Sequence, residues 1–383
     1  DNLTFSFEAD EQLGADPSGL AVSVDGPSTT DAYSFDRNAF SESGSGPYTY
    51  TLSANQSYDD GDGTYEATVD AAVDPAGNDG ADGTQTDTYT LDTSAPNVSV
   101  TDPSDGAVVQ SQSTIAGSAS DNLQVTDVVL TIQRTSDGSY WDGGSWVTTE
   151  TTVSATADDG TFDSGDESWS YEASSITGED TYDVTAEATD GDGNTQATTI
   201  SYTIDTTAPT VSGVTLGNDG SGNLDFQFDT DEQLGSGTSD IAVTVDGPSG
   251  TDAYSFDGGD FSETDNGDGT YTYDLNATEA YGSDGSYTAA VDDAVDPAGN
   301  DGTDGTQTDS YTFDATAPTI SGGSVAADNA YVDVSFSEGV YTSSDGTGAL
   351  TTGDLTLTFT QNGGSATDAT IEDVTTTGGN ALS

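Results

Sequence analysis

A short joint occurs three times in the chain and divides it into pieces the size of whole domains. The copies begin at Asp92, Asp205 and Asp314, read DTSAPNVSV, DTTAPTVSG and DATAPTISG, and lie 113 and 109 residues apart. Solenoid repeats have units of roughly 20 to 50 residues, so each interval here is long enough for a complete domain. The proline in each joint fixes φ and keeps the preceding residue extended, which predicts short, stiff connections.

Duplicated sequence relates two of the predicted domains. NLTFSFEADEQLG from Asn2 matches NLDFQFDTDEQLG from Asn223, and AVDPAGNDGADGTQTDTYT from Ala72 matches AVDPAGNDGTDGTQTDSYT from Ala294. The domain between them has no such match and is of another type. The predicted domains are 1–91 (type A), 92–204 (type B), 205–313 (type A again) and 314–383 (a partial domain).

Alternating apolar and polar residues predict β-strands along the whole chain. Examples are Leu3, Phe5, Phe7; Leu20, Val22, Val24; Tyr182, Val184, Ala186; and Ile241, Val243, Val245. Turn-forming pairs such as Asp62-Gly63 and Asp284-Gly285 separate these runs, and no segment has helical periodicity. Many short strands in units of about 110 residues predict an all-β fold of tandem immunoglobulin-like β-sandwiches rather than barrels, arranged as an extended rod.

Both ends of the sequence lack strands that the complete domains have. The segment TAPTVSGVTLGNDGSG precedes the duplicated region in 205–313, nothing corresponds to it before Asp1, and 314–383 is shorter than its neighbours. We expect the chain to be a stretch of a longer protein. The alternative is that another subunit supplies the absent first strand of 1–91, because a sandwich without an edge strand exposes unpaired backbone groups.

The composition is extremely acidic, with 70 acidic residues, two basic ones and a formal net charge of −68. Low hydrophobicity with such charge is typical of disordered chains. The alternating placement of 18 Tyr, 12 Phe and three Trp favours a folded protein with an acidic surface instead. Molar salt shortens the screening length to about 3 Å and suppresses the repulsion, as in proteins of salt-loving organisms.

Several classes of function are excluded by the residue types. The chain has no His, Cys or Lys, which removes common nucleophile–base pairs, zinc sites and Schiff-base lysines. A carboxylate pair could hydrolyse a glycoside, but among 70 acidic residues none is singled out, and we expect no enzyme here. Arg37 and Arg134 cannot form a nucleic-acid footprint, and no apolar run reaches the roughly 20 residues of a membrane span.

Calcium is the cofactor that this composition favours, since Ca²⁺ binds six to eight carboxylate, amide and carbonyl oxygens. Gly-rich acidic loops precede the last strand of three predicted domains, and we expect cations to link such loops to the joints. The alternative is that these are solvated acidic turns. The candidate ligands are Asp74, Asn78, Asp79, Asp82, Asp92, Asp121, Asn122, Asp190, Asp192, Asn194, Asp205, Asp296, Asn300, Asp301, Asp304 and Asp314.

Two further features have a functional and a structural interpretation. Asn-x-Ser/Thr sequons, which accept glycans if the chain is exported, occur at Asn2, Asn55, Asn97 and Asn276. Trp141 and Trp146 in YWDGGSW could form a sugar-binding platform, but hairpin or core packing is the favoured interpretation, with Trp169 packing on them.

The closing segment ATDGDGNTQATTISYTIDTTAP from Ala188 and the opening segment IAGSASDNLQVTDVVLTI from Ile115 resemble the bacterial Ig-like repeat domains of large secreted and cell-surface proteins. YVDVSFSEGVY from Tyr331 is similar to related surface repeats. The resemblance implies an extracellular location, and calcium at interdomain joints as in some members. The acidic bias suggests a haloarchaeal version.

The favoured function is a structural role in a surface layer, filament or stalk, with the chain itself or other surface-protein subunits as partners. One alternative is an adhesin whose repeats project a tip that binds glycans or neighbouring cells. Another is an accessory region of a secreted hydrolase. Nucleic acid is not expected as a partner.

Overall fold

The computed structural model describes residues 2–28, 32–57, 61–81, 83, 85–303, 307–327, 331–342, 348–365, 367–375 and 381–382. Within these ranges the regular structure is β-strand apart from single-turn 3-10 helices: η1 (Pro17–Gly19), η2 (Arg37–Ala39), η3 (Gly258–Asp260) and η4 (Thr352–Asp354). No helix in the described part is long and apolar enough to cross a membrane. The predicted all-β fold is confirmed.

The contacts divide the chain into two compact units. One is Asp1–Ala208 with Val295–Asp301, and the other is Pro209–Ala294 with Gly302–Ser383. Strands β7 (Thr86–Leu91), β18 (Thr195–Ile204) and β26 (Thr308–Phe313) end at the residues that precede the three joints. The division into four domains remains a prediction.

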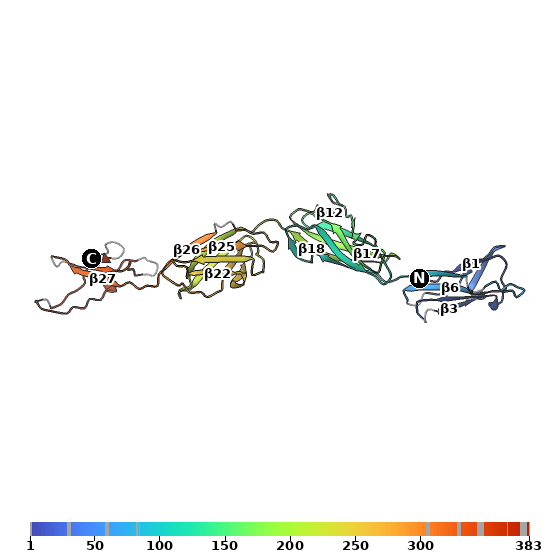
Figure 1. Ribbon diagram of the computed structural model, residues 1–383, viewed down its shortest axis with the longest axis horizontal. Coiled ribbons are helices and arrows are strands. Elements are labelled where there is room, and N and C mark those ends of the chain that lie inside the picture. The colour runs from blue at the N-terminus through green and yellow to red at the C-terminus, as the bar shows by residue number, and fades with distance from the viewer. Residues whose placement is uncertain are drawn as a thin grey trace. The chain divides into compact units, whose positions relative to one another are not determined.

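The first sandwich, formed by strands of residues 6–91, has two antiparallel sheets. One has the order β1 (Ser6–Ala9), β5 (Tyr48–Leu52), β4 (Phe40–Gly44), and the other the order β3 (Ala32–Asp36), β2 (Leu20–Asp25), β6 (Gly63–Ala72), β7. Alternate residues of a strand face the same side, so Leu20, Val22 and Val24 of β2 all enter the core between the sheets. These strands are blue in Figure 1.

The second sandwich, formed by strands of residues 97–204, is larger. Its first sheet has the order β15 (Thr156–Ala157), β16 (Asp166–Glu172), β10 (Thr114–Ser120), β8 (Asn97–Asp102). Its second has the order β13 (Trp146–Val147), β12 (Tyr140–Trp141), β11 (Val125–Arg134), β17 (Asp180–Asp190), β18, β9 (Ala107–Val109), and β14 (Val153–Ser154) also pairs with β11. The β9–β18 pair is parallel. Trp169, Tyr182 and Tyr202 are fully buried between the sheets.

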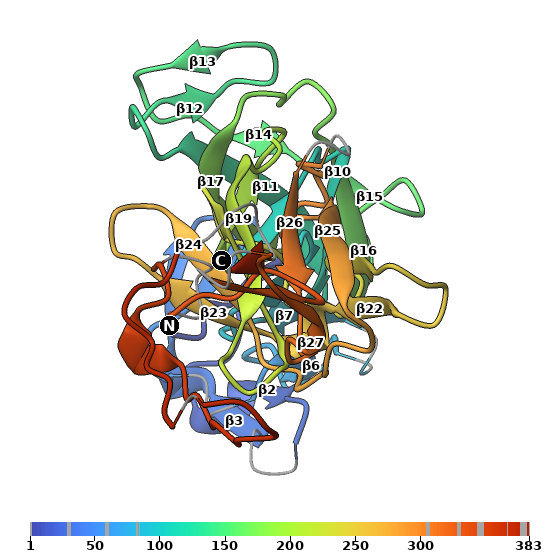
Figure 2. The same ribbon diagram turned by 90° about the vertical axis from the view of Figure 1, so that its left-hand side faces the viewer.

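The tryptophan hairpin of the second sandwich packs rather than presenting a platform. Trp141 pairs with Trp146 across β12 and β13, with ring centroids 5.2 Å apart, at the edge of the sheet shown in Figure 2. Trp146 stacks on Tyr182, and the Trp141 indole N–H donates to the Tyr171 hydroxyl at 2.9 Å. The packing interpretation of these tryptophans is confirmed. Trp169 belongs to the same core.

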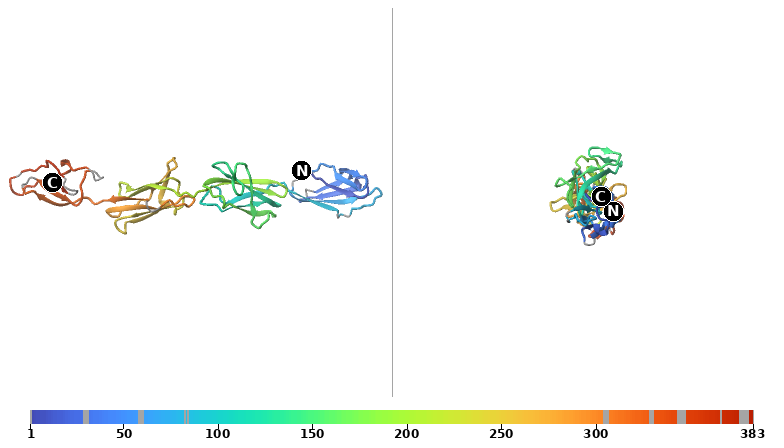
Figure 3. Two further views of the ribbon diagram at one scale, coloured as in Figure 1. Left: turned by 90° about the horizontal axis from the view of Figure 1, so that it is seen from above. Right: turned by 90° about the vertical axis from the view of Figure 1, so that its right-hand side faces the viewer.

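The third sandwich, drawn yellow-green to orange in Figure 1 and Figure 3, repeats the first with one strand more. Its sheets have the orders β19 (Val211–Asn218), β20 (Leu224–Thr230), β24 (Tyr271–Leu275), β23 (Phe261–Asp265) and β22 (Ala253–Asp257), β21 (Ile241–Asp246), β25 (Gly285–Ala294), β26. β20 corresponds to β1 of the first sandwich, and no strand among the described residues of the first sandwich corresponds to β19. A final sheet has the order β27 (Ile320–Val325), β28 (Val332–Phe336), β29 (Ala381–Leu382).

Candidate functional site at the joints

A carboxylate holds each joint at the point where the last strand of a sandwich ends. Asp62 accepts hydrogen bonds from the Thr93 backbone N–H at 2.9 Å, the Thr93 hydroxyl at 2.8 Å and the Ser94 hydroxyl. At the next joint Glu179 accepts from the Thr206 N–H at 3.2 Å and the Thr207 hydroxyl at 2.8 Å. Each carboxylate thus fixes the first turn of the joint that follows its own sandwich.

The third joint has the same device. Asp284 accepts from the Ala315 N–H at 2.7 Å and from the Thr316 hydroxyl. These hydrogen bonds stabilise the ionised form, so the bond from Ala315 and then that from Thr316 lower the pKa of Asp284. Bonds from Ser94 and Thr93 lower the pKa of Asp62, and bonds from Thr206 and Thr207 lower that of Glu179.

Sequence reasoning missed these three anchoring carboxylates. Each lies immediately before the long strand that pairs with the last strand: Asp62 before β6, Glu179 before β17 and Asp284 before β25. Because the pair is antiparallel, the start of the long strand lies beside the end of the last one, as in the Gly63–Leu91 pair. An acidic residue at this position in all three copies was the available signal.

The predicted acidic loops form one recurring turn in which Asp binds the Asn four residues later. Asp190 Oδ1 accepts from the Asn194 N–H at 2.8 Å and Oδ2 accepts from its side-chain amide at 2.7 Å. Asp74–Asn78 and Asp296–Asn300 repeat both bonds. In these turns the carboxylate accepts the hydrogen bonds that a backbone carbonyl would otherwise accept. Asp is suited to the position for this reason.

Two of these turns also bind the joint that opens their own sandwich. The Asn194 amide donates to the Asp92 carbonyl at 3.1 Å, and the Asn300 amide donates to the Asp205 carbonyl at 3.1 Å. Asp192 Oδ2 accepts from the Asp92 N–H at 2.8 Å. The joint at Asp92 is therefore held on one side by Asp62 and on the other by the turn of the second sandwich.

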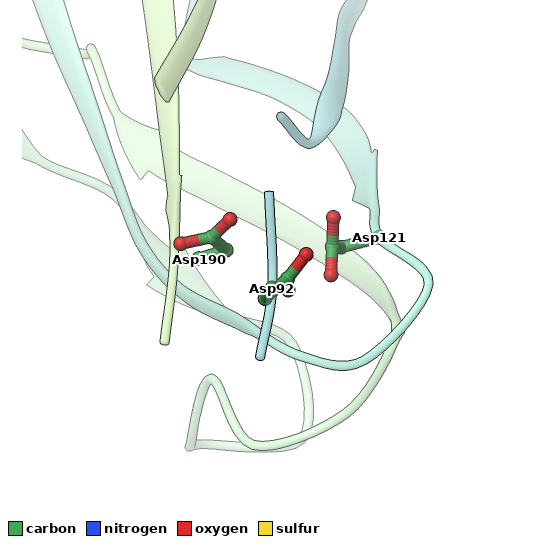
Figure 4. A group of neighbouring side chains, drawn as sticks. All are labelled: Asp92, Asp121 and Asp190. Carbon is green, nitrogen blue, oxygen red and sulfur yellow. The ribbon is translucent and has the colours of Figure 1, made fainter. Parts of the chain in front are cut away.

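Three predicted calcium ligands meet at this joint. Asp92, Asp121 and Asp190 each place a carboxylate oxygen within 4.8 Å of the others, and Asp92 lies between its two neighbours in Figure 4. Asp92 is 7% exposed and Asp190 2% exposed. Burial, followed by the charges of Asp121 and Asp190, raises the pKa of Asp92 although the Ser94 N–H donates to it. Two buried carboxylates and one half-buried carboxylate have thus been brought together here.

The residues near this cluster have defined partners. Asp121 Oδ1 accepts from the Leu123 N–H at 2.8 Å and the Gln124 N–H at 3.1 Å, which positions its carboxylate. The Asn122 amide donates to Asp62 at 3.3 Å. Three carboxylates can supply part of the oxygen shell that Ca²⁺ requires, with water or carbonyl oxygens completing it.

Other predicted ligands have contacts of their own. Asp205 and Asp296 have carboxylate oxygens within 4.8 Å of one another. Asp79 accepts from the Ala72 and Ala81 N–H groups, and Asp301 forms a β-bridge with Val295.

At the third joint Asp314 accepts from the Thr316 N–H. Burial and the Asp314 carboxyl raise the pKa of Glu338, so acidic groups approach one another at this joint too. Asp82 and Asp304 lie outside the described residues.

The other candidate groups lie on the surface or are neutralised. Asn2, Asn55, Asn97 and Asn276 are all exposed, as a glycan acceptor has to be. Both arginines bind carboxylates: Arg37 pairs with Glu42 at 2.6 Å and Arg134 with Asp137 at 2.5 Å.

Comparison with known proteins gives partial similarities. No family model matches the chain. Halomucin from Haloquadratum walsbyi is 44% identical over 66 residues, which amount to 17% of this chain and 1% of halomucin. The matched stretch is therefore a very small part of that relative.

Some solved structures also match. A tetra-tandem repeat in the extending region of a large adhesion protein is 20% identical, with 88% of this chain and 76% of that chain covered and a TM-score of 0.28. Dimeric latent PorU from Porphyromonas gingivalis is 12% identical, with 71% and 28% covered and a TM-score of 0.22. At these scores the overall superposition is poor, and no functional conclusion follows from it.

Proposed function

We propose that the chain is a structural, non-enzymatic segment of an extracellular protein of a halophile, serving in a surface layer, filament or stalk. The observation that carries the proposal is the repeated anchoring of the joints by Asp62, Glu179 and Asp284. A flexible connection would leave the joint backbone to water. A carboxylate holds the same position of the joint in all three copies. Such repeated anchoring suits a chain that transmits position or load between its domains.

The surface chemistry and one comparison support the halophilic setting. A net charge of −68 produces strong self-repulsion in dilute buffer that molar salt screens. The 44% match to a segment of halomucin is a match to a protein of Haloquadratum walsbyi. Exposed sequons at Asn2, Asn55, Asn97 and Asn276 are the positions we propose for glycans in this setting.

Immunogold labelling of cells of the source organism tests the location and role. We expect label on the cell exterior, together with regular periodic density in negatively stained surface preparations that disappears when the gene is deleted. Label confined to the cytoplasm would contradict the proposal. Binding to partner cells or polysaccharide that depends on a terminal domain alone would favour the adhesin alternative, and a catalytic domain in the same polypeptide would favour the secreted hydrolase.

We also propose that Asp92, Asp121 and Asp190 bind calcium and so stabilise the first joint. The supporting observation is that three carboxylates with oxygens within 4.8 Å of one another include two buried ones, and the pKa of Asp92 is raised by burial and by the other two. A divalent cation would offset this repulsion. A solvated acidic turn would not require three carboxylates to converge with two of them buried.

Trp141, Trp146 and Trp169 are the three tryptophans of the chain, so tryptophan fluorescence reports unfolding of the second sandwich alone. We expect millimolar calcium to raise the unfolding midpoint of the unaltered chain in molar KCl, and a chelator to reverse the rise. Asp92→Asn should abolish the response while raising the midpoint in chelator, since it removes a charge from the cluster. Asp127→Asn, an exposed change on β11, is the matched control and should leave the calcium response intact. An equal calcium response in Asp92→Asn would contradict the site without affecting the structural role.

A further inference from the structure

The residue types of this chain leave few side chains that an oxidant can attack. Sulfur-containing side chains react readily with oxidants, and the chain has no Cys and no Met. It also has no His, so Trp and Tyr are the readily oxidised side chains that remain. All three tryptophans belong to the second sandwich, which therefore holds every indole ring of the chain.

Exposure distinguishes Trp146 from the other two tryptophans. Trp141 is 5% exposed and Trp169 is 0% exposed, whereas Trp146 is half-buried. Trp146 also lies in β13, the edge strand of its sheet (Figure 2). A dissolved oxidant has to approach a ring closely to take an electron from it, because electronic coupling decreases steeply with distance. Trp146 is therefore the indole at which a dissolved oxidant reacts.

A continuous path leads from Trp146 to Tyr171 on the opposite sheet. The ring centroids of Trp146 and Trp141 are 5.2 Å apart, and the Trp141 indole N–H donates to the Tyr171 hydroxyl at 2.9 Å. Tyr171 lies on β16, in the other sheet of the sandwich, and is half-buried. Since each neighbouring pair is in direct contact, an electron can pass from Tyr171 to Trp146 in two short steps.

A second branch leads from Trp146 into the core. Trp146 stacks on Tyr182 with ring centroids 5.6 Å apart, and the Tyr182 ring lies 5.4 Å from that of Tyr202. A phenol gives up an electron readily at neutral pH only when its O–H proton can leave as well. The Tyr182 hydroxyl donates to the Gly178 carbonyl, which is a very weak base. The Tyr202 hydroxyl has no hydrogen-bond partner among the described residues.

Burial also opposes loss of a proton along this inner branch. Tyr182 is 0% exposed and Tyr202 is 1% exposed, so neither hydroxyl is placed to give its proton to solvent. Burial accordingly raises the pKa of Tyr182 and the pKa of Tyr202. The inner branch is thus unfavourable for oxidation, whereas the half-buried Tyr171 is near the solvent that accepts its proton.

We propose that Trp146, Trp141 and Tyr171 form an electron relay that carries one-electron oxidation from the edge hairpin to Tyr171 and keeps it out of the core. A diffusible one-electron oxidant takes an electron from Trp146 and is itself reduced. Trp141 returns an electron to Trp146. Tyr171 then returns one to Trp141 while its O–H bond breaks and the proton passes to water.

The product of the relay is a neutral tyrosyl radical at a half-buried position. A dissolved one-electron reductant restores the phenol there by supplying an electron, with a proton from water. The second sandwich thereby gains a renewable defence against oxidants in a chain that has no Cys or Met to provide one. The relay goes beyond the proposed function and does not depend on it.

Pulse radiolysis of the complete 383-residue chain in molar KCl tests the relay. Azidyl radicals are the oxidant probe, since each takes one electron and becomes azide. We expect the optical absorption of a tryptophanyl radical to form first and to decay while that of a tyrosyl radical grows at the same rate. This rate should be independent of protein concentration. A rate proportional to protein concentration would show that separate molecules exchange the electron and would overturn the relay.

Tyr171→Phe is the discriminating variant, because it removes only the hydroxyl. The concentration-independent tyrosyl phase should be lost, and the tryptophanyl radical should persist. Tyr140→Phe is the matched control, since Tyr140 precedes Trp141 in β12 and faces the other side of the sheet. This control and Tyr182→Phe should both keep the tyrosyl phase. An unchanged phase in Tyr171→Phe, or its loss in Tyr182→Phe, would overturn the relay.

Trp141→Phe tests the path without altering the phenol. Tyr171→Phe leaves the buried Trp141 N–H without its acceptor, at a cost in stability, so amide hydrogen exchange is used to verify that each variant is folded. Trp141→Phe removes the N–H together with the indole and keeps an aromatic ring in the core. We expect it to abolish the tyrosyl phase as well. A folded Trp141→Phe variant that transfers the electron at the unaltered rate would exclude this path.

Discussion

The first and third sandwiches share closely similar segments and differ in how completely they bury the matching side chains. At one buried hydroxyl they agree in detail: the Tyr50 hydroxyl accepts from the Leu13 N–H at 2.8 Å, and the Tyr273 hydroxyl accepts from the Leu234 N–H at 2.7 Å. Near β19 they diverge, since Phe228 is fully buried and Phe7 is half-buried. The alternation of apolar and polar residues therefore determines which face of the sheet a side chain lies on. The neighbouring strand determines what fraction of that side chain is buried.

The largest expected effect comes from giving the first sandwich a strand equivalent to β19. Placing residues 210–222, which contain β19 and its connecting loop, directly before Asn2 reproduces the connection that precedes Asn223. Burying the apolar residues of the added strand should stabilise the first sandwich by about 3 kcal/mol. Amide exchange of residues 3–9 and 86–91 should slow by roughly 100-fold.

The same graft with Asp in place of the residues equivalent to Val211 and Leu216 is its control. In this control, amide hydrogen exchange of residues 3–9 and 86–91 should remain as in the unaltered chain. If both grafts protect equally, added length rather than strand burial would explain the effect.

A matched pair of substitutions sharpens the comparison next. Phe228→Ala should destabilise the third sandwich by about 4 kcal/mol, as expected for a fully buried phenylalanine. Phe7→Ala should cost the first sandwich about 2 kcal/mol, because its ring is already half in water. Hydrogen exchange resolved by peptide distinguishes the two sandwiches within one chain, and equal losses would show that the exposure of Phe7 has no energetic consequence.

A smaller difference should appear at the recurrent turns. The Asn300 amide binds both Asp296 and the Asp205 carbonyl, whereas the hydrogen bond described for the Asn78 amide is to Asp74. Asn300→Ala should therefore cost about 1 kcal/mol more than Asn78→Ala. Denaturant titrations of the two variants, followed by peptide-resolved exchange, measure this difference. Equal costs would imply that the contact with the Asp205 carbonyl contributes nothing.

The smallest expected effect concerns the joints, where the first and third sandwiches should behave alike. Asp62 and Asp284 both have a pKa lowered by hydrogen bonds from the following joint. A carboxylate with a lowered pKa stabilises the folded state above its unfolded pKa of about 3.9, and this contribution disappears as the pH falls through the lowered value.

NMR titration of the Thr93 and Ala315 amides should give midpoints below about 3.9 for both, and Asp62→Asn and Asp284→Asn should remove the corresponding transitions. A midpoint at the ordinary value at one joint would show that its anchor does not form. The two copies would then differ at the joint as well as at the strand edge.

The sequence predicted the strands because alternation is a local property. The residues of β2, β17 and β21 that were expected in the core are buried there. The tryptophan hairpin was also predictable, since Asp142 to Gly144 can form a tight turn and the flanking Trp141 and Trp146 then pair.

The candidate site was predicted only in part. Asp92, Asp121 and Asp190 were on the list of expected ligands, but so were Asp79, which binds backbone N–H groups, and Asn122, which binds Asp62. Asp and Asn are common both in turns and as cation ligands, so composition does not distinguish the two roles. The convergence of Asp92, Asp121 and Asp190 depends on distances between loops that are far apart in the chain.

By itself, the sequence determined the strand periodicity, the recurrence of the joint and the charge, because each depends on residues that are neighbours or on a simple sum. The tertiary structure decided which carboxylate anchors which joint and which three carboxylates converge. These depend on strand order and pairing, which bring together loops that are far apart in the chain.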